Sequence, residues 1–444
     1  MESTVEFTVA TAPFARAAAR ADRLLPPRAA RAGGVRVAVA GRQLRLSASG
    51  EEAGVWGDVP ATVNTDGVVA VGRRALAATL ASLDAPEVRV RVEGSRLAIR
   101  TGSARFALPL LDPAALGPAP EPPPVAGRAP AGAFMAAVAA VAGAASRDGL
   151  PLFSGVRVRS DADRLRLAAT DRFRLAVASV PWSGEGPVDV LIPAGILAEA
   201  ARMLAKPETA EVTVLADADR LGLSWAEGGV VVSSLALPYP DAQLERMLSV
   251  RPECVVDVDA DLLRAAVERA MPFAGPIGTV TLEAADGVVV VRGSDDGAGD
   301  SREEVKAETT GSTTASYQGR YLLDSLRAFG DDRVVLRFQT GIQPTSITAA
   351  AHGTTESAAV RSPGTDVGAA AQSAGTEGTA AQGAGTDGTA ARSGTADGTA
   401  ARSGTADGTA ARSTAAGDTT GHRVGTDTHR TELRYLVVPL RKSP

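Results

Sequence analysis

The chain has 444 residues, a formal net charge of -5 and one cysteine, Cys254. This length can bury large cores, so we expect about two to four domains rather than one small module. A single cysteine excludes an internal disulfide, and no stretch reaches the roughly 18 unbroken apolar residues of a membrane helix. The N-terminus also lacks the pattern of a signal peptide, so we predict a cytoplasmic protein with no membrane partner.

The composition favours an α+β fold. Hydrophobic residues make up 45% of the chain but aromatic residues only 4%, so the cores must consist mainly of Val, Leu and Ala. Such a composition suits many short strands together with Ala-rich helices. The negative total charge argues weakly against nucleic acid as the main partner, but a total does not show where the basic residues lie.

The same order of predicted elements occurs three times along the chain. The first half of each unit predicts a strand, an Ala-rich helix and two further strands, over 5–48, 131–171 and 254–295. The second half predicts strand, helix and strand, over 69–94, 190–217 and 315–341. Helical spacing supports these assignments, because Phe134, Val138 and Val141 fall on one face. A repeat of this length indicates three related domains, each with two helices and about eight strands.

Composition also predicts the domain boundaries. The segment Pro113–Pro130 is rich in proline and indicates a linker, and a second boundary falls near Ser249. We therefore expect domains at 1–123, 124–248 and 249–444. Between about 349 and 428 the chain consists mainly of Ala, Gly, Thr and Ser, which predicts a disordered, low-complexity insert. Because the final segment YLVVPL again has a strand pattern, we expect the insert to be a surface loop before the last strand.

Residues that usually carry catalysis are scarce. All three histidines, His352, His422 and His429, lie in or beside the insert, which disfavours acid–base catalysis. Cys254 opens a predicted strand without a basic neighbour, so we interpret it as a small buried hydrophobe.

The spacing of Asp257, Asp259 and Asp261 imitates a calcium loop. Leu262 stands where that loop needs glycine, and an amphipathic helix follows, so Asp259 or Asp261 is better explained as a helix N-cap. The sequence predicts no catalytic residue, metal site or cofactor.

Basic residues on the predicted helices have two interpretations. On spacing alone they are ordinary solvated faces. Equivalent helices of repeated units can also be brought onto one surface, where their charges would add up.

Three segments resemble the DNA polymerase III β-subunit family, the bacterial DNA sliding clamps. Leu150–Val177 is similar to the family's middle-domain signature, with its A-T-D-x-x-R-L-A end. GRYLLDSLRAF resembles the helix of the third domain, and YLVVPLR resembles the C-terminal signature. The resemblance covers the chain apart from the insert.

The resemblance implies three clamp domains, each with two helices packed on antiparallel sheets, in a head-to-tail homodimer that closes into a ring. Such a ring is a non-enzymatic processivity factor that encircles duplex DNA without reading its sequence. Its implied protein partners are the DNA polymerase III α subunit, the clamp loader and other proteins with a clamp-binding motif. A ring with a basic hole and an acidic rim could bind DNA although the total charge of the chain is negative.

The resemblance also assigns candidate site residues. The partner-peptide pocket comprises Phe153, Thr170, Phe173, Arg174, Leu175, Pro240, Arg246, Met247, Gln318, Tyr321, Pro344, Val438, Pro439, Leu440 and Arg441. The residues expected to face DNA are Arg16, Arg20, Arg23, Arg28, Arg73, Arg147, Arg202 and Lys206. The dimer interface is expected at Phe106 and Leu108 of the first domain and Phe273 of the third.

Two departures from the family pattern favour a divergent paralogue over the main replicative clamp. Ser249 stands where the family usually has proline, and the insert is not typical. The insert, together with a tail that continues past Arg441 as Lys442–Pro444, motivates the alternative function, a clamp-like protein-interaction scaffold or antagonist that does not serve replication.

Overall fold

The structure is a computed structural model, which describes residues 5–25, 33–146, 149–204, 210–249, 251–339, 341, 343–350 and 431–440. The predicted insert lies outside these residues except for Ala349 and Ala350, and so do the three histidines. No helix in the described part of the chain is both long enough and apolar enough to span a bilayer.

The first repeat forms two helices and eight strands among the described residues. They are β1 (Glu6–Ala10), α1 (Thr11–Leu24), β2 (Gly34–Ala40), β3 (Gln43–Ser49), β4 (Ala53–Thr65), β5 (Gly67–Gly72), α2 (Arg73–Ala81), β6 (Glu87–Glu93), β7 (Arg96–Arg100) and β8 (Arg105–Leu111).

The second repeat has the same order, with one additional short strand and a connecting helix. Its elements are β9 (Val125–Pro130), α3 (Ala131–Ala142), β10 (Gly155–Asp161), β11 (Arg164–Thr170), β12 (Arg174–Pro181), β13 (Ser183–Gly184), β14 (Asp189–Pro193), α4 (Ala194–Met203), β15 (Glu211–Ala216), β16 (Arg220–Trp225), β17 (Gly228–Ser233) and the connecting helix α5 (Asp241–Leu248).

The third repeat again contains two helices and eight strands in the part of the chain that is described. They are β18 (Cys254–Asp259), α6 (Ala260–Ala270), β19 (Thr279–Ala285), β20 (Val288–Asp295), β21 (Gly299–Thr310), β22 (Thr313–Gln318), α7 (Gly319–Arg327), β23 (Arg333–Phe338), β24 (Thr345–Ala349) and β25 (Glu432–Val437).

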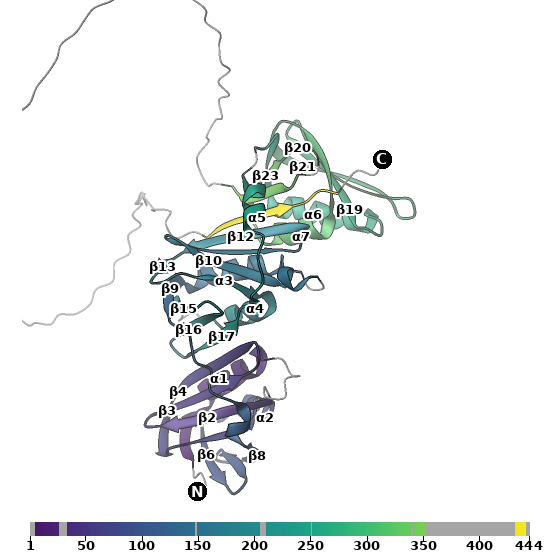
Figure 1. Cartoon of the computed structure of the whole chain (residues 1–444). Coiled ribbons are helices and arrows are strands. Elements are labelled where there is room, and N and C mark those ends of the chain that lie inside the picture. Colours follow the sequence, from purple (N-terminus) through teal and green to yellow (C-terminus); the bar gives the residue numbers. More distant parts are fainter. Residues whose placement is uncertain are drawn as a thin grey trace, which may run out of the picture. The chain divides into compact units, whose positions relative to one another are not determined.

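The two helices of each repeat pack against each other, as α1 with α2, α3 with α4 and α6 with α7 (Figure 1). Their apolar faces turn into the core, and the predicted face of α3 is confirmed, since Phe134, Val138 and Val141 are all fully buried. Small alanines between these residues let the helices approach their sheets closely. Asp259 is the N-cap of α6, as predicted, because its carboxylate accepts a hydrogen bond from the Leu262 N–H at 3.0 Å.

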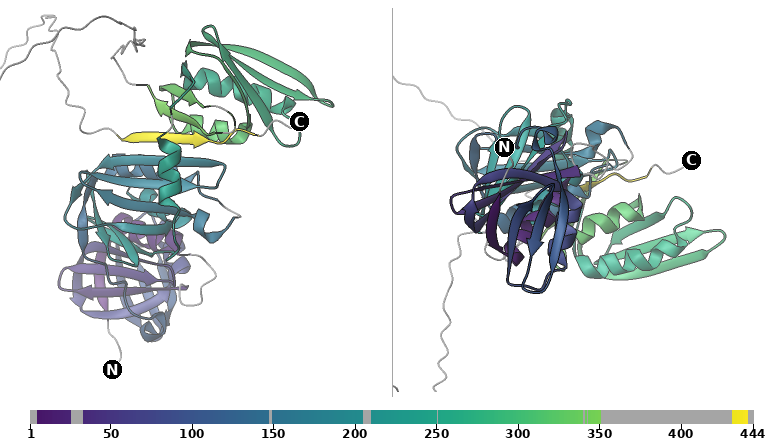
Figure 2. Two further views of the ribbon diagram at one scale, coloured as in Figure 1. Left: turned by 45° about the horizontal axis from the view of Figure 1, so that its top comes forward. Right: turned by 90° about the horizontal axis from the view of Figure 1, so that it is seen from below.

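Sheets continue from one repeat into the next. Strand β17 of the second repeat pairs antiparallel with β4 of the first, within a sheet of 13 strands. The last described strand, β25, returns to the third repeat by pairing with β24, as predicted, and its other edge pairs with β12 of the second repeat. The left view of Figure 2 shows β25 in yellow between the strands of the second repeat and those of the third. Backbone hydrogen bonds therefore join all three repeats.

Candidate functional site

The candidate peptide pocket is built around the tight hairpin loop between β11 and β12. Asp171 accepts hydrogen bonds from the backbone N–H groups of Phe173 and Arg174, both at 3.0 Å. Arg172 has a φ of +80°, in the left-handed region that residues other than glycine seldom adopt. The Thr170 hydroxyl donates to the Arg174 carbonyl at 2.6 Å. The A-T-D-R-F-R motif therefore fixes the directions of Phe173 and Arg174.

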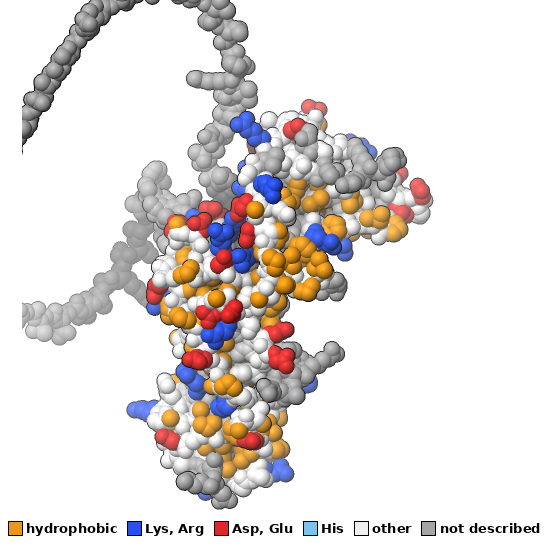
Figure 3. Space-filling model, in the orientation of Figure 1, with side chains coloured by type: hydrophobic (Ala, Val, Ile, Leu, Met, Phe, Trp, Pro, Cys, Tyr) orange, Lys and Arg blue, Asp and Glu red, His pale blue; other side chains and the backbone are white. Residues whose placement is uncertain are grey.

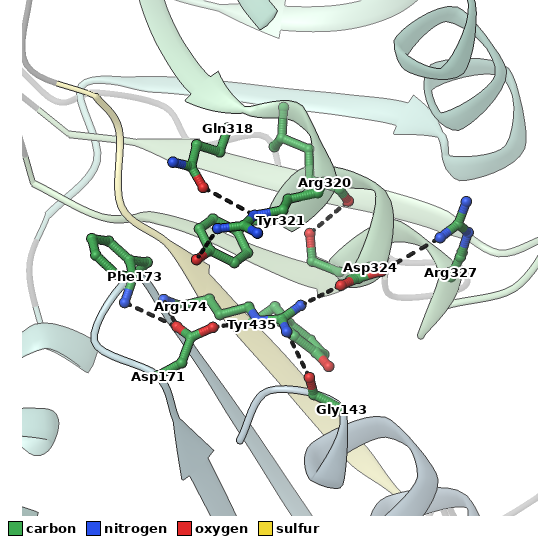
Figure 4. Close-up of polar contacts among 12 residues, drawn as sticks. Gly143, Asp171, Phe173, Arg174, Gln318, Arg320, Tyr321, Asp324, Arg327 and Tyr435 are labelled. Atoms are coloured by element: carbon green, nitrogen blue, oxygen red, sulfur yellow. Dashed lines mark hydrogen bonds and ion pairs between the residues drawn. The ribbon is translucent and has the colours of Figure 1, made fainter. Parts of the chain in front are cut away.

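The Arg174 guanidinium links three segments that are far apart in the sequence (Figure 4). It donates to Asp171 at 3.1 Å, to Asp324 of α7 at 2.7 Å and to the Gly143 carbonyl at 2.7 Å. Burial alone would lower the pKa of Arg174, but the hydrogen bond to Asp324 and the charges of Asp171 and Asp324 outweigh it and raise that pKa. Arg174 is thus a permanent charge that ties the second repeat to the third.

Aromatic side chains and arginines cover this network. Phe173, which is 47% exposed, stacks on Tyr321 with 5.8 Å between the ring centroids. The Arg172 guanidinium lies 5.8 Å from the Phe153 ring and 5.9 Å from the Phe173 ring. Arg320 lies 4.7 Å from the Tyr321 ring and also donates to the side-chain oxygen of Gln318. Guanidinium groups over aromatic faces give an amphipathic surface of the kind that binds peptides.

The predicted C-terminal residues of the pocket lie beside this surface. The Val438 N–H donates to the Phe173 carbonyl at 2.9 Å, and the Leu440 N–H donates to the Ser316 carbonyl of β22 at 2.7 Å. Pro439 is buried, and so is Pro344. Arg441 lies outside the described residues.

The remaining predicted pocket residues lie on the other face of β12. Successive side chains of a strand alternate between its faces, so Leu175 points away from the side on which Arg174 lies. It packs in an apolar cluster with Ala168, Val177 and Leu436, and Met247 of α5 covers that cluster. Pro240 precedes α5, and the exposed Arg246 donates to the Ala242 carbonyl of that helix at 3.1 Å. The predicted pocket therefore divides between two faces of one strand.

Four of the arginines expected to face DNA come together. Arg16, Arg20 and Arg23 of α1 line a surface cavity of about 650 Å³ with Arg202 of α4. Glu199 is the only carboxylate among the described residues that line it, and it pairs with Arg202 at 2.7 Å. Arg20 is partly neutralised as well, since it donates to Glu227 at 3.2 Å. The cavity keeps an excess of positive charge contributed by the helices of two successive repeats.

The expectation for Arg73 is wrong. Its side chain is only 5% exposed and lies 3.3 Å from the Asp22 carboxylate of α1. Burial lowers the pKa of this guanidinium, while the charge of Asp22 opposes that effect. Because α2 begins at Arg73 and packs on α1, this arginine is enclosed between the helices and cannot reach a phosphate. Arg28, Arg147 and Lys206 lie outside the described residues.

The expected dimer residues lie near open strand edges. Phe106 and Leu108 belong to β8, whose Arg105–Pro109 segment pairs with β7, while β8 reaches β5 only at Leu110 and Leu111. On the third repeat, Phe273 packs against Gly293 of β20. The segment Gly299–Lys306 of the adjoining β21 pairs only with β20 among the described strands.

Several residues of the site were not predicted from the sequence. Asp171, Asp324, Gly143 and Tyr435 all surround Arg174. Asp171 belongs to the quoted A-T-D motif and could have been included, whereas Asp324 is 150 positions from Arg174 and gives no local signal.

Cys254 is fully buried, as predicted, and burial raises the pKa of its thiol. Within the described ranges, no group of three or more His, Cys, Asp or Glu side chains could hold a metal ion.

These features define a three-domain, α+β clamp fold with a basic helical surface and an amphipathic site between its second and third repeats. The DNA polymerase III beta subunit models match the chain as an N-terminal domain over 5–116, a central domain over 130–235 and a C-terminal domain over 246–360. The chain belongs to this family, the beta sliding clamps, which confirms the predicted family, fold class and sliding-clamp function.

Individual relatives support the same family assignment. The chain is 29% identical to the beta sliding clamp of Streptomyces coelicolor over 339 residues, covering 74% of this chain and 90% of the relative. It is 32% identical to that of Micrococcus luteus over 246 residues, covering 52% and 78%. The crystal structure of the Pseudomonas aeruginosa clamp bound to griselimycin matches the fold with a TM-score of 0.72 and 21% identity, covering 78% of this chain and 96% of that one.

Proposed function

We propose that two copies of this chain close head to tail into a ring around duplex DNA and hold replication or repair proteins on it. The observation that carries this proposal is the basic cavity between α1 and α4. It presents Arg16 and Arg23 of α1 and Arg202 of α4, from two successive repeats, with one carboxylate among its described lining residues. Arginines that meet phosphates along a helical lining attract any DNA sequence. Arg28, Arg147 and Lys206 stay predictions for the same surface.

Ring closure is supported by two open strand edges of opposite charge. Beside Phe106, the first repeat exposes Arg96, Arg100 and Arg105, and Glu93 forms ion pairs with Arg100 and Arg105. The open segment Gly299–Lys306 of β21 is acidic by one charge, since it carries Asp300, Glu303 and Glu304 together with Arg302 and Lys306. Pairing β8 of one copy with β21 of the next would bury both edges and bring these charges together. Phe106, Leu108 and Phe273 would then lie at the interface.

The surface of Phe173, Tyr321 and the Val438–Leu440 segment is proposed as the peptide site for a polymerase α subunit, a clamp loader and other partners. The exposed Phe173 ring, stacked on the buried Tyr321 and held over a fixed arginine network, is suited to anchoring a short hydrophobic peptide. The similar clamp from Pseudomonas aeruginosa was crystallised bound to griselimycin, and we propose griselimycin as a ligand of this chain also. The protein acts without catalysis, and its cytoplasmic location stays a prediction.

The test is loading onto nicked circular DNA by the host's clamp loader. The wild-type chain is expected to elute with the plasmid in gel filtration. Reversing the charges with Arg16→Glu, Arg23→Glu and Arg202→Glu should lower the retained fraction at least tenfold, because three phosphate contacts become repulsive. The matched control is Arg128→Glu, an exposed arginine on β9 whose partner is Glu185. Equal retention of the triple variant and the control would contradict the DNA-facing role, and no retention of the wild type would favour the alternative scaffold function.

A further inference from the structure

Arg337 and Arg434 lie on one face of the three neighbouring strands β23, β24 and β25. In the sheet register, Arg337 is opposite Ser346, and Thr348 is opposite Arg434. Because side chains alternate along a strand, Tyr435 points to the other face, where its hydroxyl donates to a backbone carbonyl of α3. The two arginines and the two hydroxyl side chains therefore lie together on the side of the sheet that faces away from α3.

These side chains line a cavity of about 290 Å³ beside the C-terminal end of α5. Its polar side carries the two arginines, the hydroxyls of Ser346 and Thr348 and the Gln339 amide. Figure 3 shows basic side chains over the region where Figure 1 labels α5 and β23. Among the described residues that line the cavity there is no carboxylate. The apolar side consists of Met247, Leu248 and Pro252.

Neither arginine forms an ion pair with a residue that the structure describes. Arg337 donates to the Thr348 hydroxyl at 2.8 Å, and Arg434 donates to the carbonyl of Leu248, the last residue of α5, at 3.2 Å. Burial, and then the positive charge of Arg434, lower the pKa of Arg337. The two guanidinium groups thus repel each other, and an anion between them would be stabilised by both.

The carboxylates of the neighbouring cavity do not fill this role. That cavity shares Leu248, Thr348 and Arg434 with the first. Two of its carboxylates, Glu245 and Glu432, form ion pairs with other arginines. Its third described carboxylate belongs to β10, which is three strands away from β25 in the sheet. An anion from solution would therefore meet little competition from the chain.

The donors suit a phosphate group better than a carboxylate. A guanidinium carries several N–H donors, so each arginine keeps some of them for the cavity after its one hydrogen bond. The Thr348 hydroxyl accepts from Arg337 and keeps its own hydrogen to donate. One guanidinium fork satisfies a carboxylate, whereas the oxygens of a phosphate can accept from both arginines and both hydroxyls at once. Because a water molecule takes about 30 Å³ of the liquid, the cavity also has room for part of an organic group.

We propose that this cavity binds a phosphate group, either as the free ion or as a phosphate monoester whose organic part lies against Met247, Leu248 and Pro252. The bound phosphate would bridge Arg337 of β23 and Arg434 of β25, and so brace the arginine that holds the end of α5. The site shares no residue with the basic cavity between α1 and α4 and requires neither DNA nor a peptide, so it goes beyond the proposed function.

Calorimetric titration with inorganic phosphate at constant ionic strength tests the site. The parent protein carries Arg16→Glu, Arg23→Glu and Arg202→Glu, so that the basic cavity between α1 and α4 contributes no phosphate binding. Adding Arg337→Gln and Arg434→Gln should weaken phosphate binding at least tenfold. A tenfold loss corresponds to about 1.4 kcal/mol, which is less than one charge-assisted hydrogen bond contributes.

The matched control adds Arg89→Gln and Arg91→Gln to the same parent. These two arginines lie on one face of β6 and are each 60% exposed, so their loss should change the affinity by no more than about twofold. A loss for the variant of Arg337 and Arg434 no larger than that for the control would overturn the proposal. Arg434→Gln alone alters an exposed side chain and leaves the core intact, so it serves if the double variant does not fold. It should weaken phosphate binding at least threefold, and unchanged affinity would overturn the proposal as well.

Two further anions define the ligand class. Acetate should bind at least tenfold more weakly than inorganic phosphate, because a carboxylate leaves half of the donors unused. Equal affinity for acetate would overturn the assignment to phosphate. Phenyl phosphate separates the two sources of the group: binding that depends on both arginines and is tighter than that of inorganic phosphate supports an ester, and weaker binding supports the free ion. These outcomes do not depend on whether the protein loads onto DNA.

Discussion

Replacing Arg174 with alanine tests whether its hydrogen bonds hold the second and third repeats together. The change removes three donor contacts, to Asp171, Asp324 and the Gly143 carbonyl. Breaking a buried ion pair costs about 3 to 5 kcal/mol. The lower end of this energy range applies to Arg174, because Asp171 keeps two backbone donors and the Asp324 side chain is 45% exposed to water. We therefore expect the free energy of unfolding to fall by about 3 kcal/mol.

Urea unfolding followed by tryptophan fluorescence measures this loss. The matched control is Arg327→Ala, which removes a 53% exposed partner of the same Asp324 and should cost under about 1 kcal/mol. Arg174→Lys should recover only part of the loss, since an ammonium group lacks the planar fork that reaches three acceptors. A loss for Arg174→Ala no larger than that for Arg327→Ala would refute the reasoning.

Three further changes test the core, the pocket and the ring. Phe134→Ala removes a fully buried ring from α3 and should lower the free energy of unfolding in urea by about 3 to 5 kcal/mol. The control Leu150→Ala changes a 60% exposed side chain and should alter that free energy by no more than about 0.5 kcal/mol. Pro439→Ala together with Leu440→Ala should lower griselimycin affinity at least tenfold in calorimetry while leaving the solution mass unchanged; unchanged affinity would mean that the pocket is wrongly located. Phe106→Asp introduces a charge at the proposed dimer edge. Light scattering should show the solution mass fall from that of a dimer to the 45.0 kDa of one chain. A dimer of undiminished stability would place the interface elsewhere.

Much of the fold could be predicted from local sequence patterns. Helical spacing identified the buried face of α3 through Phe134, Val138 and Val141, because a face that packs on a sheet must be apolar at every turn. The segment YLVVPL was recognised as a returning strand. Its pairing with β12 of another repeat was not, since both edges of a strand are equally able to pair and only the assembled sheet decides between them.

Residues of the site could be predicted from the sequence only where they belong to a recognisable motif. The A-T-D-R-F-R motif located Phe173 and Arg174, but the partner Asp324 lies in another repeat. Arg73 was expected on the surface because a charge usually is, yet the neighbouring Asp22 allows it to be buried. The connecting helix α5 was not foreseen either, because an isolated segment of eight residues has little helical stability of its own and depends on the patch it covers.

Linearising the DNA beneath a loaded protein tests the central claim most directly. Protein loaded on a nicked circular plasmid is separated from free protein, the circle is cut once with a restriction enzyme, and the protein that still elutes with the DNA is measured. A closed ring with its arginines turned to the duplex should remain on the circle and slide from the free ends after the cut. Protein that stays on the linear DNA in undiminished amount is bound by affinity alone, and that result would contradict encirclement.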